Sequence, residues 1–223
     1  MNRIRKHLTA LRHDQSGLSL AEILIAMMLT SLILVMITSM LISTSKLTTA
    51  ASQTRSSNGA AANISNSITS VLRMATTLAK SSSAIPDPAI VAGTASSLTL
   101  YSYSNTNAAN PAPVKVTFTL ASGALTETRC TGVASGNFWT FGGCSATSTR
   151  TVGSGMTSDP LFTYRDANGT AYAIGTGSLS ATQRAAVGSI TVNVRVQAAG
   201  TSTDPVIISS TVVLRNLGLD TGS

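Results

Sequence analysis

Glu22 is the residue of this chain whose chemistry is hardest to explain by ordinary packing. It stands directly before an uncharged run, residues 23–45, and five residues after Gly17. A carboxylate at the start of an apolar helix is costly in hydrocarbon and is therefore a functional candidate by default. Two uses remain open for it: it can neutralise a nearby cation, or it can extend to the membrane surface as a solvated acid.

The element that positions Glu22 is a predicted membrane-spanning helix. A bilayer-spanning helix needs about 20 apolar residues, and residues 23–45 supply them. The head before it carries four cations and the single acid Asp14. Because Lys and Arg stay on the cytoplasmic side, we expect the head inside the cell and the C-terminal bulk outside. The cations of the head are Arg3, Arg5, Lys6 and Arg12.

Three interpretations of this N-terminal segment compete. A secretory signal peptide has an apolar region of about 7–15 residues and a small-residue cleavage site, for which Thr49-Ala50-Ala51 is a weak match. The apolar run is too long for that interpretation, which also leaves Glu22 unexplained. A plain signal anchor fits the length and orientation but leaves Gly17 and Glu22 as accidents.

The third interpretation accounts for every part, because the segment resembles the class III leader of type IV prepilins and pseudopilins. In that family a short basic leader ends in glycine, cleavage follows the glycine, and the fifth mature residue is glutamate. Here the cut would fall between Gly17 and Leu18, and Glu22 would be the fifth mature residue. Leu18 stands where phenylalanine is usual, and Ser-Leu-Ala follows where Thr-Leu-Ile is usual.

The resemblance implies an electrostatic role for this site. Cleavage would create an α-amino cation at Leu18, one helical turn from the Glu22 carboxylate. The family implies that a prepilin peptidase cuts the chain and methylates this amine. It also implies that Glu22 of an incoming subunit pairs with the amino terminus of its neighbour. The implied partners are the peptidase, other pilin or pseudopilin subunits, an inner-membrane assembly platform and, before assembly, membrane lipid.

The rest of the chain predicts an α+β, pilin-like fold, in which a long N-terminal helix packs on a small antiparallel sheet domain. Ala61, Ile64, Ile68, Val71, Ala75 and Leu78 recur at helical spacing, which predicts a helix to about Lys80. Neither Pro nor Gly occurs from Leu18 to Asn58, so the apolar half should be unbroken. We expect a leader at 1–17, a transmembrane and filament-core helix at 18–45, an amphipathic helix at 46–85, and a β-rich exported domain at 86–223.

Alternation of apolar and polar residues predicts the strands of that domain. Period-two runs occur near Leu98–Leu100, at Val114–Leu120 and at Ile190–Val196, and a final β-branched run occupies Val206–Leu214. Asp166-Ala167-Asn168-Gly169 favours a hairpin turn over a calcium loop, since its spacing matches no calcium motif. Residues 179–187 read as a short helix. The segments 162–169 and 211–217 resemble parts of J-type minor pseudopilins and minor pilins.

Two cysteines, Cys130 and Cys144, fall in the part that we expect to be exported, where a disulfide is the favoured interpretation. The enclosed loop holds Trp139, the only tryptophan. A ring in such a loop is either an exposed adhesive contact or a plug for a small core beneath the loop, and we favour the plug.

Composition argues against several other functions. Both histidines, His7 and His13, lie in the leader, so the exported domain has no histidine base or ligand. There is no nucleophile elbow and no phosphate loop. We therefore expect no enzyme, no cofactor and no metal. From Leu18 onward 11 basic and 7 acidic residues leave +4, spread thinly, which argues against nucleic acid.

The sequence thus predicts a prepilin-like precursor cut after Gly17. It would be a subunit, most like a minor one, of a type IV pilus or related pseudopilus, serving adhesion, motility, DNA uptake or protein secretion. The alternative is an uncut bitopic membrane protein with an extracytoplasmic binding domain.

Overall fold

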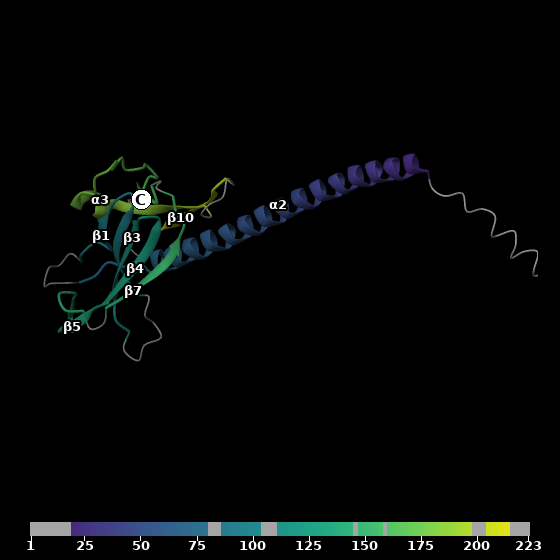
Figure 1. Ribbon diagram of the computed structural model, residues 1–223. Coiled ribbons are helices and arrows are strands. Elements are labelled where there is room, and N and C mark those ends of the chain that lie inside the picture. The colour runs from purple at the N-terminus through teal and green to yellow at the C-terminus, as the bar shows by residue number, and fades with distance from the viewer. Residues whose placement is uncertain are drawn as a thin grey trace, which may run out of the picture. The chain divides into compact units, whose positions relative to one another are not determined.

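The computed structural model describes residues 19–79, 86–103, 111–144, 147–157, 160–197 and 204–214. The chain divides into two units, Met1–Ala51 and Ser52–Ser223. One helix, α2 (Leu20–Arg73), contributes to both, and Figure 1 shows it as an uninterrupted ribbon. The absence of Pro and Gly over its apolar part explains that continuity, and the helix also continues through Gly59.

In the part of the second unit that the structure describes, three antiparallel sheets accompany the end of α2 and a short helix. The five-stranded sheet has the order β1 (Ile90–Gly93), β2 (Ser97–Ser102), β3 (Val114–Ala121), β4 (Ala124–Thr131) and β7 (Thr147–Ser154). The three-stranded sheet has the order β10 (Val206–Val213), β9 (Val187–Val196) and β8 (Phe162–Asp166). A small ribbon joins β5 (Val133–Ser135) to β6 (Phe138–Thr140).

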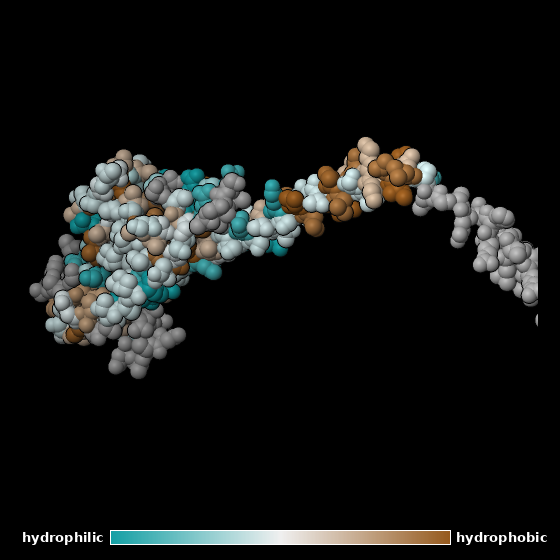
Figure 2. Space-filling view, in the orientation of Figure 1, coloured by the Kyte–Doolittle hydropathy of each residue, from teal (hydrophilic) through white to brown (hydrophobic). Residues whose placement is uncertain are grey.

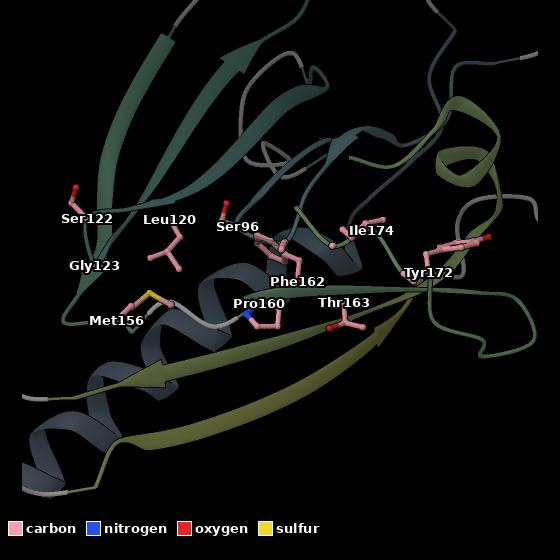
Figure 3. A pocket seen from close by; sticks show the side chains of 13 residues that line it. Ser96, Leu120, Ser122, Gly123, Met156, Pro160, Phe162, Thr163, Tyr172 and Ile174 are labelled. Atoms are coloured by element: carbon pink, nitrogen blue, oxygen red, sulfur yellow. The ribbon is translucent and has the colours of Figure 1, made fainter. Parts of the chain in front are cut away.

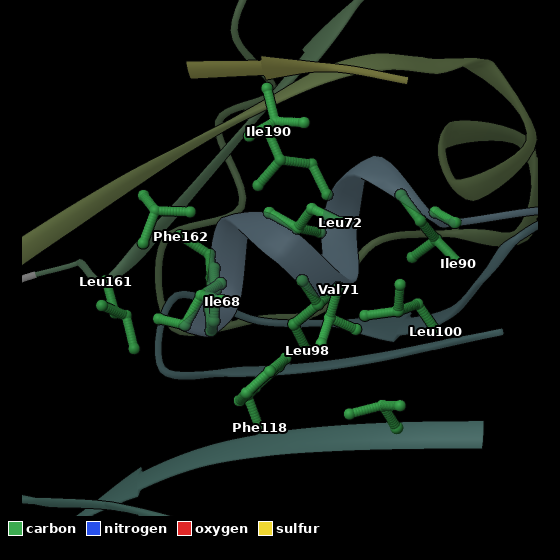
Figure 4. Packing of buried hydrophobic residues seen from close by; sticks show 14 of the residues in the cluster. Ile68, Val71, Leu72, Ile90, Leu98, Leu100, Phe118, Leu161, Phe162 and Ile190 are labelled. Carbon is green, nitrogen blue, oxygen red and sulfur yellow. The ribbon is translucent and has the colours of Figure 1, made fainter. Parts of the chain in front are cut away.

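The core of this unit lies where α2 meets both larger sheets. Ile68, Val71 and Leu72 of the helix are almost fully buried. In Figure 4 they lie between Ile190 of β9 on one side and Phe118 of β3 on the other. The amphipathic half of the helix is therefore sandwiched by sheet residues, as its periodicity predicts. The predicted α+β fold, with a long N-terminal helix packed on antiparallel strands, is confirmed.

The helix ends at Arg73, earlier than the predicted end near Lys80. Ala75 and Leu78, which fit the helical spacing, instead form antiparallel bridges to Ser102 and Asp87. Both side chains are buried, so the same apolar residues are satisfied by sheet contacts after the helix stops. Hydrophobic spacing alone does not distinguish these two outcomes.

The predicted turn at residues 166–169 is present. The Asp166 carboxylate accepts hydrogen bonds from the amides of Asn168 (2.9 Å) and Thr170 (2.7 Å), and Gly169 has φ of +84°. The return segment only bridges at Ala171 and does not form the full second strand that we expected. The predicted short helix is α3 (Ala181–Ala186), which begins with a capping box between Ser180 and Gln183.

Candidate functional site

The first turn of α2 contains a reciprocal cap between Ser19 and Glu22. The Glu22 amide donates to Ser19 Oγ, and the Ser19 amide donates to Glu22 Oε2, each at 3.2 Å. Ser-x-x-Glu is the sequence signature of this capping box, so the residue types and spacing of Ser19 and Glu22 already encode it. Gly17 and Leu18, the predicted processing residues, lie outside the described residues.

This cap defines what the Glu22 carboxylate can do. Oε2 is occupied by the backbone of its own helix, whereas within the described residues Oε1 accepts no hydrogen bond. The side chain is exposed. A carboxylate fixed at a helix N-terminus, with one oxygen directed to other partners, is suited to neutralising a cation brought to it.

Beyond the cap, α2 presents apolar side chains on all sides. From Leu20 to Leu47 its large aliphatic residues are between 43% and 79% exposed. Figure 2 shows them gathered along the N-terminal part of the helix. The helix is long and apolar enough to cross a membrane, and none of its most apolar window is buried. This surface is stable in lipid or against other helices but not in water.

Five hydroxyl groups of this apolar segment donate hydrogen bonds to carbonyls of their own helix. Thr30 donates to the Ala26 carbonyl, Thr38 to the Leu34 carbonyl and Thr44 to the Met40 carbonyl. Serine at positions 31 and 39 makes the equivalent bond three residues back. These five hydroxyl donors are thus already satisfied within the helix, which would lower the cost of placing them in hydrocarbon.

In the second unit, α2 is joined to the five-stranded sheet by a buried acid. Glu127 is fully buried, and its two carboxylate oxygens accept from Arg129 Nε (2.6 Å) and from Arg150. Arg150 Nη2 also donates to Ser67 Oγ of α2 at 2.9 Å. Both arginines keep contact with solvent, with side chains 33% and 57% exposed. The cluster therefore fixes the helix against β4 and β7, and nothing in it resembles a catalytic pair.

The structure joins Cys130 to Cys144, the pairing that the sequence predicts, with Cα atoms 5.3 Å apart. The enclosed β5–β6 ribbon is attached to the domain by Phe141, whose ring stacks on Tyr101 at 5.0 Å. The Trp139 amide also donates to the Ala79 carbonyl at 3.2 Å. The Trp139 side chain is half-buried. It is therefore intermediate between an exposed adhesive contact and a fully buried plug, the two alternatives that the sequence left open.

A cleft of about 550 Å³ opens at the other end of the five-stranded sheet. Figure 3 shows Leu120, Met156 and Phe162 around it, with the hydroxyls of Ser96 and Ser122 at its rim. Among the described residues its lining has no charged side chain, and the titratable group that it includes is the Tyr172 phenol. Within the residues that the structure describes, no group of three metal-ligating side chains occurs.

Nearby, Tyr164 is fully buried, and its hydroxyl donates to the Thr94 carbonyl at 2.9 Å. Burial raises the pKa of this phenol well above its ordinary value, because the phenolate would lose its solvation. The phenol is thus a neutral donor that fixes β8 to the turn before β2. Gly93 allows this approach, since a Cβ there would lie 2.8 Å from the tyrosine ring.

Comparison with solved structures finds similar folds. No family model matches the chain, and no curated protein gives a significant match. A solved structure that is similar is the crystal structure of the GspK-GspI-GspJ complex from the type 2 secretion system of enterotoxigenic Escherichia coli. The match has 13% identity and a TM-score of 0.37, and it covers 70% of this chain and 97% of the other. Neither the identity nor the TM-score is high enough to carry a conclusion about function.

Proposed function

We propose that this chain is the precursor of a pilin-like subunit, most like a minor one, of a type IV pilus or a related pseudopilus. A peptidase cuts it after Gly17, and the mature chain of 206 residues (223 minus 17) begins at Leu18. Glu22, in the first turn of an unbroken helix with exposed apolar side chains all round, is the observation that carries the proposal. Such a helix is accommodated by lipid before assembly and by neighbouring helices afterwards.

The Glu22 carboxylate sets the axial register of neighbouring subunits in the filament. Glu22 Oε1 pairs with the new amino terminus of a neighbouring subunit while Oε2 keeps its own helix capped. Inside a dry helical bundle an unpaired carboxylate costs several kcal/mol, so the pairing selects one axial position. The chain lies in the cell membrane with its N-terminus in the cytoplasm, and its second unit is outside. It acts by packing and display rather than by catalysis.

The test is incorporation of full-length chains into sheared filaments, with wild type and Glu22→Ala compared at equal membrane levels. The expected result is that wild type appears in the sheared fraction and that Glu22→Ala stays in the membrane. Normal incorporation of the variant would contradict the pairing role. The second candidate, an uncut bitopic protein with an outer binding domain, predicts that neither chain is found in filaments.

A further inference from the structure

The outer edge of β10 differs from the outer edges of β1, β7 and β8, because within the described part of the chain it carries no feature that blocks pairing. Proteins protect edges with short strands, bulges, charges or covering segments. β1 has only four residues and an irregular register. β7 has an interrupted register and carries Arg150. β8 is covered where Tyr172 donates to the Tyr164 carbonyl.

β10 shows none of these devices among the described residues. It pairs with β9 over Val206–Val213 in one continuous register. Its sequence, VIISSTVV, contains no charge and no proline, and five of its eight residues are valine or isoleucine. Ile207 and Val213 are 61% and 59% exposed. A long, regular, apolar edge of this kind is a template for another strand.

The hydrogen bonds show which residues of β10 face outward. Leu214 donates to the Gly188 carbonyl opposite it, so residues of even number on β10 bond to β9. Asn193 of β9 donates in the other direction, to the Leu161 carbonyl, which confirms the alternation. The amides and carbonyls that point away from β9 are therefore those of Ile207, Ser209, Thr211 and Val213.

We propose that this edge of β10 binds an extended strand of a neighbouring subunit, which completes the hydrogen bonds of these four residues. Only an extended backbone presents donors and acceptors at the matching repeat. The added strand carries β-branched or hydroxyl side chains, because a charge placed beside Ile207 or Val213 would lose solvation without gaining a partner.

The bound strand belongs to a neighbouring subunit whose α2 helix runs in the same direction as that of this chain. This part of the proposal rests on the proposed function. Two copies joined antiparallel through β10 would be related by a twofold axis perpendicular to the sheet. That axis would reverse the direction of the helix segment packed on each sheet, which contacts β10 through Ser65 and Ser210. Subunits anchored by α2 in one membrane share one direction, so self-pairing of β10 does not fit.

The experiment measures residue-level hydrogen exchange of the full chain in detergent and in sheared filaments. In detergent, the amides of Ile207, Ser209, Thr211 and Val213 should exchange at least tenfold faster than those of their even-numbered neighbours. In filaments, the same four amides should become protected at least tenfold, while the even-numbered ones change little. Filament incorporation of Ile207→Lys should fall about tenfold. Val133→Lys, a matched change at a 37% exposed valine in the disulfide loop, should assemble normally.

Each other outcome overturns a defined part of the proposal. If wild type enters filaments and the four amides still exchange rapidly, strand addition is wrong and the proposed function stands. Protection already present in the monomer would mean that the chain's own segments cover the edge. Protection that rises with concentration in detergent would mean a second copy. A wild-type chain absent from filaments would contradict the proposed function and, with it, this occupant.

Discussion

Ser19 and Glu22 cap the first turn of α2 by exchanging two hydrogen bonds, each 3.2 Å long. The carboxylate that we propose for subunit pairing thus also stabilises its own helix. The proposal gives Glu22 two separable roles: its shape and acceptor oxygen cap the helix, whereas its charge would attract a cation. Substitutions at these two positions distinguish the roles.

Glutamine at position 22 keeps a capping acceptor and removes the charge, since Glu and Gln both serve in capping boxes. We expect Glu22→Gln to fail in filament incorporation as Glu22→Ala does. Ser19→Ala, which removes the hydroxyl cap at a cost of about 1 kcal/mol in helix stability, should still assemble. The sheared fraction measures both. Assembly by Glu22→Gln at the wild-type level would show that capping, and not charge, is what the filament needs.

The Glu127 cluster should respond asymmetrically to substitution. Glu127 is fully buried, while its partners Arg129 and Arg150 reach solvent. Replacing both arginines by methionine leaves a buried carboxylate without a cation, and should lower the free energy of unfolding by about 3–5 kcal/mol. Glu127→Gln leaves two arginines that can hydrate, and should cost about 1–2 kcal/mol. Denaturant unfolding in detergent measures both, and equal losses would contradict the asymmetry.

The disulfide should stabilise the second unit. Its sequence separation is 14 residues, for which the loss of chain entropy in the unfolded state is worth about 3 kcal/mol. Cys130→Ala with Cys144→Ala should therefore unfold at lower denaturant concentration. The fluorescence of Trp139, the only tryptophan, reports on the loop directly. If the double variant has the wild-type midpoint and fluorescence, the β5–β6 ribbon does not depend on the bond.

Tyr164 should make stability fall in alkali. Its folded-state pKa is raised by burial, so the folded chain holds the proton more tightly than the unfolded chain does. Stability from this group is complete below the ordinary tyrosine pKa, about 10, and is lost as pH rises above it. Thermal unfolding at pH 8 and pH 11 measures the effect. Tyr164→Phe should reduce the loss, whereas Phe at the exposed Tyr103 should leave it unchanged.

Much of the fold could be predicted because the sequence encodes it locally. Period-two runs identified β2, β3 and β9, a β-branched run identified β10, and helical spacing identified the face of α2 that is buried. β4 and β7 were missed because they are rich in Thr, Ser and Arg. The alternation of β4 is also hidden by Glu127, a charged residue at a buried position. Such a position is explained by its ion pairs, one with Arg129 two residues along the same strand and one with Arg150 of β7.

The candidate functional residues, too, could be predicted from the sequence only in part. The leader motif singles out Glu22 without any structure, because its spacing from Gly17 is local. The open edge of β10 could not be predicted from sequence, because it depends on which strands pair and which do not. The end of α2 at Arg73 depends on contacts too, since Ala75 and Leu78 fit either a helix face or the sheet bridges that they form.

Processing after Gly17 is tested most directly by the mass of the N-terminal peptide of the chain purified from membranes that contain a prepilin peptidase. We predict a peptide that begins at Leu18, with an N-methyl group on its amine. A Gly17→Val chain made in parallel should keep its leader. A wild-type chain that still begins at Met1 would contradict processing, and with it the amino-terminal cation on which the role of Glu22 depends.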